Sequence, residues 1–329
     1  MSRRQNKKFI FQDAGWLGRI KPDHIVTLSH NHRAASDPVF ARMLDIASED
    51  LVGVGRAGRA DVQWAIKGLR RCMNRPWPNG VIPAFVVGTN ALAKRLNREE
   101  LVSLQGAQYV FQMSMAEEVT GAASPFYAEM LAAIEHSRRN DGDNEKLRSL
   151  GVYSHVEVVL KTGAQVLIIH NDSAPVMVQD ENGMYHRIPM ATKDLVKGGR
   201  AAVHGWHNED DTDWPVVILA NGTLVLCKVK EMSHDKGDGK CVLVTQLVFV
   251  LGWAVTVHRA QGIGLDCMAA ILNRGQIWEN NQACVAMGRA TSCDALHVLA
   301  FDPAVVVTFP AVKRCHRMRS DLITSDGEM

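Results

Sequence analysis

Two segments near the end of the sequence contain side chains that could form one site. Residues 256–266 read Thr-Val-His-Arg-Ala-Gln-Gly-Ile-Gly-Leu-Asp and follow an apolar run that is typical of a buried strand. Residues 282–292 place Arg289 after a short apolar segment of helical character. A single histidine such as His258 usually has a structural role, and a single arginine after a helix usually lies on the surface. It is the order and spacing of the two segments together that indicate a site.

A glycine-rich segment at residues 53–58 matches two phosphate-binding motifs in outline. The dinucleotide motif G-x-G-x-x-G needs a preceding strand, a following helix and an acidic residue about 20 positions later. Here a helical pattern precedes the glycines, and residues 72–80 contain no acidic residue. The phosphate loop needs lysine and then serine or threonine, where this sequence has Arg59 and Ala60. We interpret the segment as a surface loop, and the sequence has no G-x-x-x-x-G-K-[ST] elsewhere.

Composition indicates a soluble protein of about two domains. The chain has 329 residues, of which 47% are hydrophobic and 22% charged, and its formal net charge is +2. This small charge gives no global basic field that would require a nucleic acid. Basic residues cluster at both ends, near residues 3–8 and 313–319, and an acidic patch lies at 209–213. We interpret the basic clusters as solvated ends.

The seven cysteines are scattered, and no Cys-x-x-Cys pair is present. This pattern predicts neither a zinc site nor a disulfide framework, and it fits a reducing compartment. The amino terminus has no apolar segment of the secretory kind, and the longest apolar run, near 247–257, is too short to cross a bilayer. We expect an intracellular protein without a membrane segment or metal ligands.

Strands and helices alternate in the first part of the sequence. Apolar runs at 25–28 and 84–87 predict buried strands, and capping residues predict helices from Ser36 or Asp37, from Asp61 and from Asn90. This alternation is typical of an α/β layer with a parallel sheet.

The middle of the sequence changes from helical to β character. Residues 115–150 are predicted to be helical, whereas 155–248 show short apolar runs separated by the turn pairs Asn182-Gly183, Gly198-Gly199 and Asn221-Gly222. This pattern predicts a small barrel inserted into the α/β domain. The α/β pattern then resumes, with strands expected near 247–251, 268–272 and 296–300, and with a helix opening in 256–266.

The two segments described first resemble motifs five and six of the Pif-type (petite integration frequency) helicases of superfamily one. Those motifs read A-x-T/S-x-H-K-S-Q-G-x-T-L-D and G-Q-x-Y-V-A-L-S-R-x-x-S. Further likenesses follow in order: residues 28–33 with Asp37 and Phe40 resemble motif four, 89–104 resemble a helical motif containing Asn90 and Asn97, and 160–167 with Asn171 resemble the signature of the family's barrel. The resemblance covers roughly residues 9 to 305.

The resemblance implies a fold and a domain plan. The fold is a RecA-like parallel sheet flanked by helices, with an inserted small Src-homology-like β-barrel. Residues 1–20 would be the exit from a first RecA-like domain that this chain does not contain. The expected parts after it are 21–115 and 247–310 for the second RecA-like domain, 116–152 for a helical insertion, 153–246 for the barrel and 311–329 for a basic tail.

The resemblance also implies roles for particular residues. Arg289 would be the arginine finger and Arg33 a second contact with the γ-phosphate of ATP, and such an arginine can contribute ~10³–10⁵ in rate. The nucleotide cleft and its coupling to DNA would use Gln261, Gly262, Thr256 and His258. Arg259, Gly264, Asn90 and Lys161 would contact DNA.

The implied function is 5′-to-3′ DNA unwinding driven by ATP, in DNA repair, recombination and telomere maintenance. ATP and Mg²⁺ would be bound mainly by the absent first domain, so this chain alone is predicted to hydrolyse no ATP. Its partners would be single-stranded DNA and that first domain, in the nucleus or mitochondrion of a eukaryote. The sequence predicts no oligomeric state.

Several departures from the family pattern leave alternatives open. Arg259 and Ala260 replace a lysine and a serine, and Gly264 replaces a threonine expected at a DNA phosphate. In motif six, Asn281, Cys284 and Gly288 replace glycine, tyrosine and serine. One alternative is a degenerate, non-catalytic module that binds nucleic acid or a protein partner. Another is a fragment of a RecD-like helicase, although the barrel signature and the Arg-Ala-Thr-Ser sequence favour the Pif type.

Overall fold

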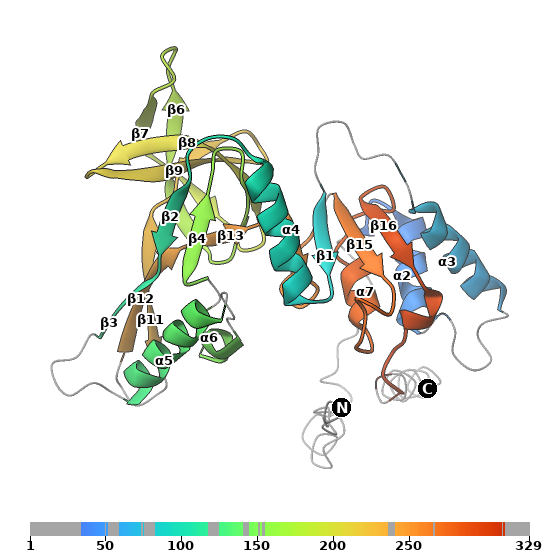
Figure 1. Cartoon of the computed structure of the whole chain (residues 1–329). Coiled ribbons are helices and arrows are strands. Elements are labelled where there is room, and N and C mark those ends of the chain that lie inside the picture. Colours follow the sequence, from blue (N-terminus) through green and yellow to red (C-terminus); the bar gives the residue numbers. More distant parts are fainter. Residues whose placement is uncertain are drawn as a thin grey trace, which may run out of the picture. The chain divides into compact units, whose positions relative to one another are not determined.

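A computed structural model describes residues 34–49, 51, 59–73, 75, 83–117, 125–140, 145–150, 152, 155–235, 241–265, 267–310 and 312 (Figure 1). The chain divides into two compact units, one of Met1–Asn90 with Thr256–Met329 and one of Ala91–Val255. Several predictions lie outside the described residues: the strand at 25–28, motif four with Arg33, the glycine-rich segment 53–58, residues 1–20 and nearly all of the basic tail.

The first unit is built on a four-stranded sheet in the order β14-β1-β15-β16, and the division between the units falls within the edge strand β14. Its strands are β1 (Ala84–Val87), β14 (Ala254–Thr256), β15 (Met268–Leu272) and β16 (Leu296–Phe301). β15 pairs in parallel with both β1 and β16. The strands are short, apolar and largely buried, as is usual for parallel strands covered on both faces. The predicted α/β class with a parallel sheet is therefore confirmed.

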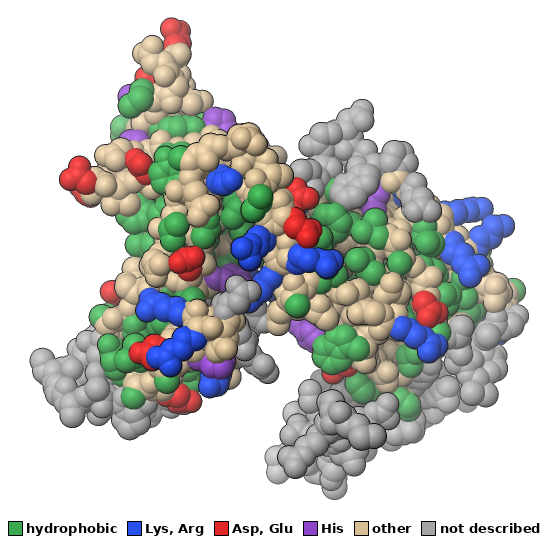
Figure 2. Space-filling view, viewed as in Figure 1, with side chains coloured by type: hydrophobic (Ala, Val, Ile, Leu, Met, Phe, Trp, Pro, Cys, Tyr) green, Lys and Arg blue, Asp and Glu red, His purple; other side chains and the backbone are tan. Residues whose placement is uncertain are grey.

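Two amphipathic helices, α2 (Pro38–Ser48) and α3 (Ala60–Arg71), pack against each other, and α3 also contacts β16. Each helix buries one apolar stripe: Phe40, Met43 and Ala47 in α2, and Val62, Ala65, Ile66 and Leu69 in α3. Lys and Arg side chains gather on the surface around α3 (Figure 2), which ends with Arg70 and Arg71. A short helix α7 (Gln282–Met287) and a 3-10 turn η4 (Pro303–Val305) complete the unit.

Asp37 begins α2 and also fixes a distant turn. Its Oδ1 accepts a hydrogen bond from the Phe40 N–H at 2.9 Å, which caps the helix, and Pro38 occupies the first helical turn. Its Oδ2 accepts from the Cys293 N–H, also at 2.9 Å, in the turn before β16. The predicted cap is thus confirmed for Asp37 rather than Ser36. The second bond was not foreseen, because the two residues are far apart in sequence.

The second unit begins with the helix α4 (Asn90–Ser103), which continues from the first unit. Its strands are β2 (Tyr109–Gln112), β3 (Ser114–Glu117), β4 (Glu157–Leu160), β5 (Gln165–Ile168), β6 (Asp172–Gln179), β7 (Tyr185–Leu195), β8 (Arg200–Glu209), β9 (Thr212–Leu219), β10 (Leu224–Leu226), β11 (Val229–Asp235), β12 (Cys241–Leu247) and β13 (Phe249–Leu251). The helices α5 (Pro125–Arg139) and α6 (Glu145–Ser149) lie between β3 and β4 in the chain.

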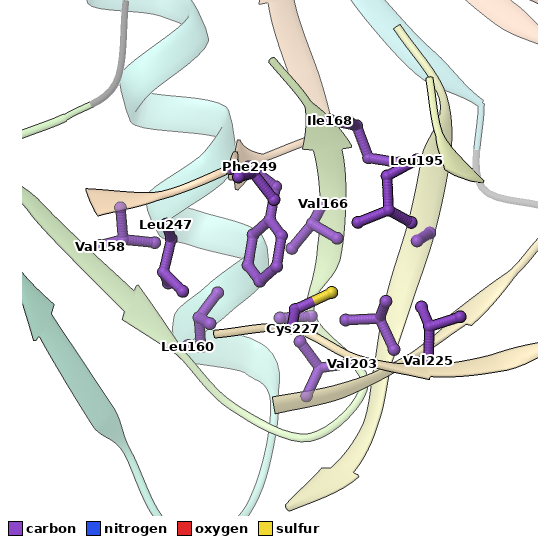
Figure 3. Close-up of a cluster of buried hydrophobic side chains, with 14 of the residues drawn as sticks. Val158, Leu160, Val166, Ile168, Leu195, Val203, Val225, Cys227, Leu247 and Phe249 are labelled. Carbon is purple, nitrogen blue, oxygen red and sulfur yellow. The ribbon is translucent and has the colours of Figure 1, made fainter. Parts of the chain in front are cut away.

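Most of these strands form a seven-stranded sheet in the order β13-β5-β8-β9-β10-β6-β7. Val166, Val203, Val225 and Phe249 from four of its strands meet in one buried core (Figure 3). Gly183, Gly198 and Gly222 have φ between 81° and 93°, so the predicted turn pairs lie where a glycine is favoured. The β-rich character of this region is confirmed, whereas its closure into a barrel stays a prediction.

Two further sheets belong to the second unit: β11-β12-β3 and β2-β4. A separate apolar cluster joins α5 to the first of these through Met130, Ile134, Val242 and Val244. The division into units places residues 91–115 with the β-rich part, whereas the sequence grouped them with 21–90. The predicted domain boundaries stay predictions.

One predicted strand lies in a different sheet from the one expected. Residues 247–251 were predicted to resume the α/β sheet, but β13 pairs antiparallel with β5 in the β-rich unit. The reason is a close approach at Gly252, where a Cβ would lie only 2.6 Å from the carbonyl carbon of Val166. Only glycine allows the chain to leave β13 at this distance, and an apolar run alone does not specify its sheet.

None of the helices in the described part of the chain combines the length and the hydropathy that crossing a membrane requires.

Asp37→Ala should destabilise the protein by about 1–2 kcal/mol, because it removes a helix cap and leaves the Cys293 N–H without its acceptor. Urea unfolding followed by circular dichroism would measure the change. Asp37→Asn keeps one side-chain acceptor and should cost less. Ser36→Ala, at the other candidate cap, should be nearly neutral; equal losses at both positions would refute the assignment of Asp37.

Candidate functional site

The carboxyl ends of β1 and β15 lie at the same edge of the parallel sheet, and the loops that follow them touch. The Gly88 N–H donates to Gln276 Oε1 at 3.2 Å. A Cβ on Gly88 would lie 1.6 Å from the Gln276 carbonyl oxygen, so no other residue type fits there without movement. Asn90 follows at the start of α4 with an exposed side chain. We refer to this surface, built by residues 88–90, 256–265 and 273–282, as the carboxyl edge.

Residues 256–265 follow directly from β14. The Val257 N–H donates to the Val87 carbonyl at 2.9 Å, which holds the start of this segment beside the end of β1. They form successive turns rather than the predicted helix. Ala260 N–H donates to the Thr256 carbonyl at 2.9 Å, but Gly262 then adopts φ +86°, which ends any helical course. The helix predicted to open here is therefore wrong.

The turns expose several of the predicted site residues. His258, Gln261, Gly262 and Gly264 are exposed, Arg259 is half-buried and Thr256 is buried. Thr256 Oγ1 accepts from the Arg259 N–H at 3.4 Å, so the buried threonine stabilises the turn from which Arg259 projects. A cation and several polar groups are thus presented on one short segment.

His258 lies beside a tryptophan that the sequence analysis did not single out. Its Nε2 is 3.3 Å from Glu279 Oε2, and its ring centroid is 6.1 Å from that of Trp278. Trp278 is 64% exposed, which is high for so large an apolar side chain. The one available signal was a tryptophan within the polar sequence that separates β15 from α7.

Gln282 holds the Trp278 loop in place. Its side-chain carbonyl accepts from the N–H groups of Trp278 at 3.0 Å and Glu279 at 3.3 Å. Gln282 is only 4% exposed, so these bonds are shielded from water. The exposed indole is therefore presented by an anchored backbone.

Arg289 joins the two segments that first indicated a site. Its Nε donates to the Val285 carbonyl at 2.9 Å, and its Nη1 is 3.4 Å from the Ile263 carbonyl oxygen. The Arg289 carbonyl accepts from the Leu265 N–H at 2.8 Å. The segments at 256–265 and 282–292 are thus neighbours in space, with Arg289 half-buried between them.

Two residues that depart from the motif-six pattern, Asn281 and Cys284, are accommodated in this structure. Asn281, in place of glycine, has φ +68°, a left-handed conformation that asparagine tolerates better than most residues. Its side chain also accepts from the Phe309 N–H at 3.0 Å. Cys284, in place of tyrosine, is 3.3 Å from the Ala47 carbonyl through its Sγ, and burial raises the pKa of its thiol to about 12.

Lys161 lies in the second unit, in the turn between β4 and β5. Its Nζ donates to the Leu104 carbonyl at 2.7 Å, which closes the chain after α4. In the same unit, the Asn97 amide donates to the Ala254 carbonyl at 2.8 Å and accepts from the Ala254 N–H at 2.9 Å, which holds α4 to the backbone of Ala254. Both family-like residues have structural contacts in this unit.

Among the residues that the structure describes, no three His, Cys, Asp or Glu side chains are placed to hold a metal ion. The carboxyl edge carries two arginines, Arg259 and Arg274, and one acidic side chain, Glu279.

Comparison with known proteins connects these features to one family. No protein-family model matches the chain. The ATP-dependent DNA helicase PIF1 of Danio rerio is 30% identical over 305 residues, which cover 92% of this chain and 39% of the relative. The ATP-dependent DNA helicase PIF1 of Emericella nidulans is 26% identical over 352 residues, covering 97% of this chain and 43% of the relative.

Solved structures agree in fold. The crystal structure of the Pif1 helicase from Candida albicans matches with a TM-score of 0.61 and 21% identity, covering 94% of this chain and 64% of that one. That of Bacteroides sp Pif1 in complex with ADP-AlF4 gives 0.54 and 14%, covering 86% of this chain and 54% of that one. The chain is a homologue of the Pif1-type helicases, and it spans less than half the length of these two curated relatives.

Gly88→Ala should displace the loop after β15, because the added methyl group would overlap the Gln276 carbonyl. We expect a loss of stability of about 1–3 kcal/mol, the usual range for overpacking. Thermal unfolding and the exchange rates of the Trp278 and Glu279 amides would report it. Gly275→Ala in the same loop meets only the Asn273 side chain at 3.3 Å and serves as the control. Unchanged amide exchange in Gly88→Ala would contradict the proposed contact.

Proposed function

We propose, from its homology to the Pif1-type helicases, that this chain forms the C-terminal part of an ATP-dependent DNA helicase. In this proposal it supplies an arginine to the γ-phosphate of ATP and part of the track for single-stranded DNA. The observation that carries the proposal is the position of Arg289 between the two motif segments, bonded to Val285 in one and close to Ile263 in the other.

The ATP-binding part of the proposal follows from the chemistry of phosphoryl transfer. An arginine that approaches the γ-phosphate neutralises charge that develops in the transition state. A first RecA-like domain would provide the phosphate loop and the Mg²⁺ ligands, since this sequence contains no G-x-x-x-x-G-K-[ST]. Arg33 is proposed as a second phosphate contact.

Contacts at Arg289 also suggest how nucleotide binding could reach the DNA. A charged phosphate competes well with neutral carbonyl groups for a guanidinium. If Arg289 turned towards ATP, the Ile263 carbonyl would lose this neighbour, and the turn around Ile263 would lose one of its contacts. Thr256, His258, Gln261 and Gly262 are proposed to transmit this change because they form or flank those turns.

The DNA-binding part of the proposal rests on the carboxyl edge. Arg259 offers a cation, Asn90 an exposed amide and Gly264 an exposed backbone, which suit contact with the phosphate backbone. Trp278 adds an exposed aromatic face on which a base could stack. Lys161 is a further proposed contact, in the second unit. A Bacteroides Pif1 structure solved with ADP-AlF3 and single-stranded DNA has a TM-score of 0.52 to this chain, which supports the fold on which the proposal depends.

The second candidate function is a non-catalytic binding module. The observation that favours it is Gly264, which lacks the hydroxyl group expected at a DNA phosphate. Asn281 favours it less, because it adopts a left-handed backbone conformation that glycine and asparagine both tolerate. DNA binding that is insensitive to ATP, even with a first RecA-like domain present, would support the module over the helicase.

Arg289→Ala should abolish ATP hydrolysis when the chain is combined with a Pif1-type first RecA-like domain, with a loss of ~10³ or more in kcat. The chain alone should hydrolyse no ATP, with or without single-stranded DNA. Arg70→Ala is the matched control, because Arg70 is an exposed arginine of the same unit in the last turn of α3, outside the carboxyl edge. Equal rates for the two variants would refute the role of Arg289.

Trp278→Ala should weaken binding of single-stranded DNA by about 1–3 kcal/mol without changing the salt dependence, because stacking releases no counterions. Arg259→Ala should instead lower the slope of log K against log salt by about 1. Fluorescence anisotropy with a labelled oligonucleotide would measure both. The control is Trp64→Ala in α3, where the ring is 39% exposed and lies beneath Arg42. Identical effects of the two tryptophan changes would contradict stacking at Trp278.

A further inference from the structure

Two cysteine sulfurs meet in the first unit, at a place that the proposed helicase function does not use. Cys72 caps the end of α3, and Cys293 lies in the turn before β16. Their Sγ atoms are 3.3 Å apart although 221 positions separate the residues. Cys72 is fully buried, whereas Cys293 is partly exposed. A small reagent could therefore reach the Cys293 sulfur from solvent, with the buried Cys72 sulfur beside it.

The backbone holds both residues in this arrangement. On the Cys72 side, its carbonyl accepts from the Val298 N–H at 2.9 Å, which fixes the end of α3 to β16. On the Cys293 side, the N–H donates to Asp37 Oδ2 at 2.9 Å and the carbonyl accepts from Arg75 Nη1 at 2.8 Å. The contact between the two sulfurs is thus held by hydrogen bonds to the backbone on both sides.

Arg75 makes the two thiols chemically unequal. Its Nη2 lies 3.8 Å from Cys293 Sγ. The hydrogen bond with Cys72 and the positive charge of Arg75 lower the pKa of Cys293 to about 7, against an opposing effect of burial. The same hydrogen bond, together with burial, raises the pKa of Cys72. The lowered pKa favours the thiolate form of Cys293, and the thiolate is the nucleophilic form.

We propose that Cys293 and Cys72 form a covalent modification site for hydroperoxides, in which Cys293 reacts first and Cys72 resolves the product to a disulfide. The Cys293 thiolate attacks one oxygen of hydrogen peroxide, the O–O bond breaks, and the departing hydroxide takes a proton to become water. Cys293 is then a sulfenic acid. The Cys72 sulfur attacks the Cys293 sulfur and displaces hydroxide, which leaves as water with the Cys72 proton. Two thiols and one peroxide give one disulfide and two waters.

The cross-link would join the end of α3 to the turn that follows Arg289. Formation needs the sulfurs to approach from 3.3 Å to a bond of ~2.05 Å. Cys293 lies on a turn whose backbone is hydrogen-bonded to Asp37 and Arg75. The turn would therefore have to shift together with the Cys293 sulfur. A disulfide here closes a long loop and should raise the thermal unfolding midpoint of the oxidised chain above that of the reduced chain.

The test is peroxide titration of the whole folded chain, with free thiols then alkylated and peptides mapped by mass spectrometry without reduction. We expect one peptide pair linking Cys72 to Cys293, lighter by two hydrogen atoms than the reduced pair. Cys227 and Cys284 serve as internal controls, because burial raises the pKa of each to about 12. Both should remain reduced. A linkage between other cysteines, or Cys293 oxidised no faster than Cys227, would overturn the proposal.

Three variants separate the parts of the proposal. Cys72→Ser should stop the reaction at the sulfenic acid, which a dimedone probe would trap on Cys293. Cys293→Ser should leave Cys72 reduced. Arg75→Gln should shift the pH profile of Cys293 alkylation towards higher pH, because the charge that favours the thiolate is lost. An unchanged profile in Arg75→Gln, with the fold intact by circular dichroism, would exclude the role assigned to Arg75. These outcomes do not depend on ATP or DNA.

Discussion

Gly88 lies so close to the Gln276 backbone that only a hydrogen atom fits between β1 and the loop after β15. This approach is possible because β1 and β15 are parallel, so their carboxyl ends lie at the same edge. From it follow the position of Asn90 at the start of α4 and the course of the loop that presents Trp278. The positions of Asn90 and Trp278 therefore depend on the parallel direction of β1 and β15 and on the absence of a side chain at Gly88.

The residues that depart from the family pattern differ in the contacts that they make in the structure. Asn281 has a left-handed backbone at the start of α7 and bonds to the Phe309 N–H. Cys284 is partly buried beside the Ala47 carbonyl. Gly264 is exposed and has no such compensation, since a lost hydroxyl group leaves only backbone to contact a ligand. The departures therefore bear on the proposed DNA contact at Gly264 more than on the fold around Arg289.

Sequence patterns predicted the features that depend on local physics. The parallel strands at 84–87, 268–272 and 296–300 follow from short apolar runs, and the α2 cap was predicted at Ser36 or Asp37 and lies at Asp37. Patterns failed where a single glycine or a distant group decides. The helix expected after Thr256 is replaced by turns that pass through Gly262, and β13 pairs with β5 because Gly252 lets two backbones approach. The exposure of Trp278 depends on Gln282, and the meeting of Cys72 with Cys293 depends on the whole α/β unit.

Arg289 lies between two parts of the chain that are fixed independently. On one side are the carbonyls of Val285 and Ile263, and on the other is the turn whose Cys293 N–H is bonded to Asp37. An arginine that acts on a phosphoryl group must be positioned before the reaction, because reorganisation during the reaction would cost much of the electrostatic gain. A guanidinium bonded to carbonyls meets this need while remaining exchangeable, since each neutral bond is weaker than one to a phosphate. Asp37 ties the start of α2 to the turn that follows Arg289, so we expect it to contribute to the position of that arginine.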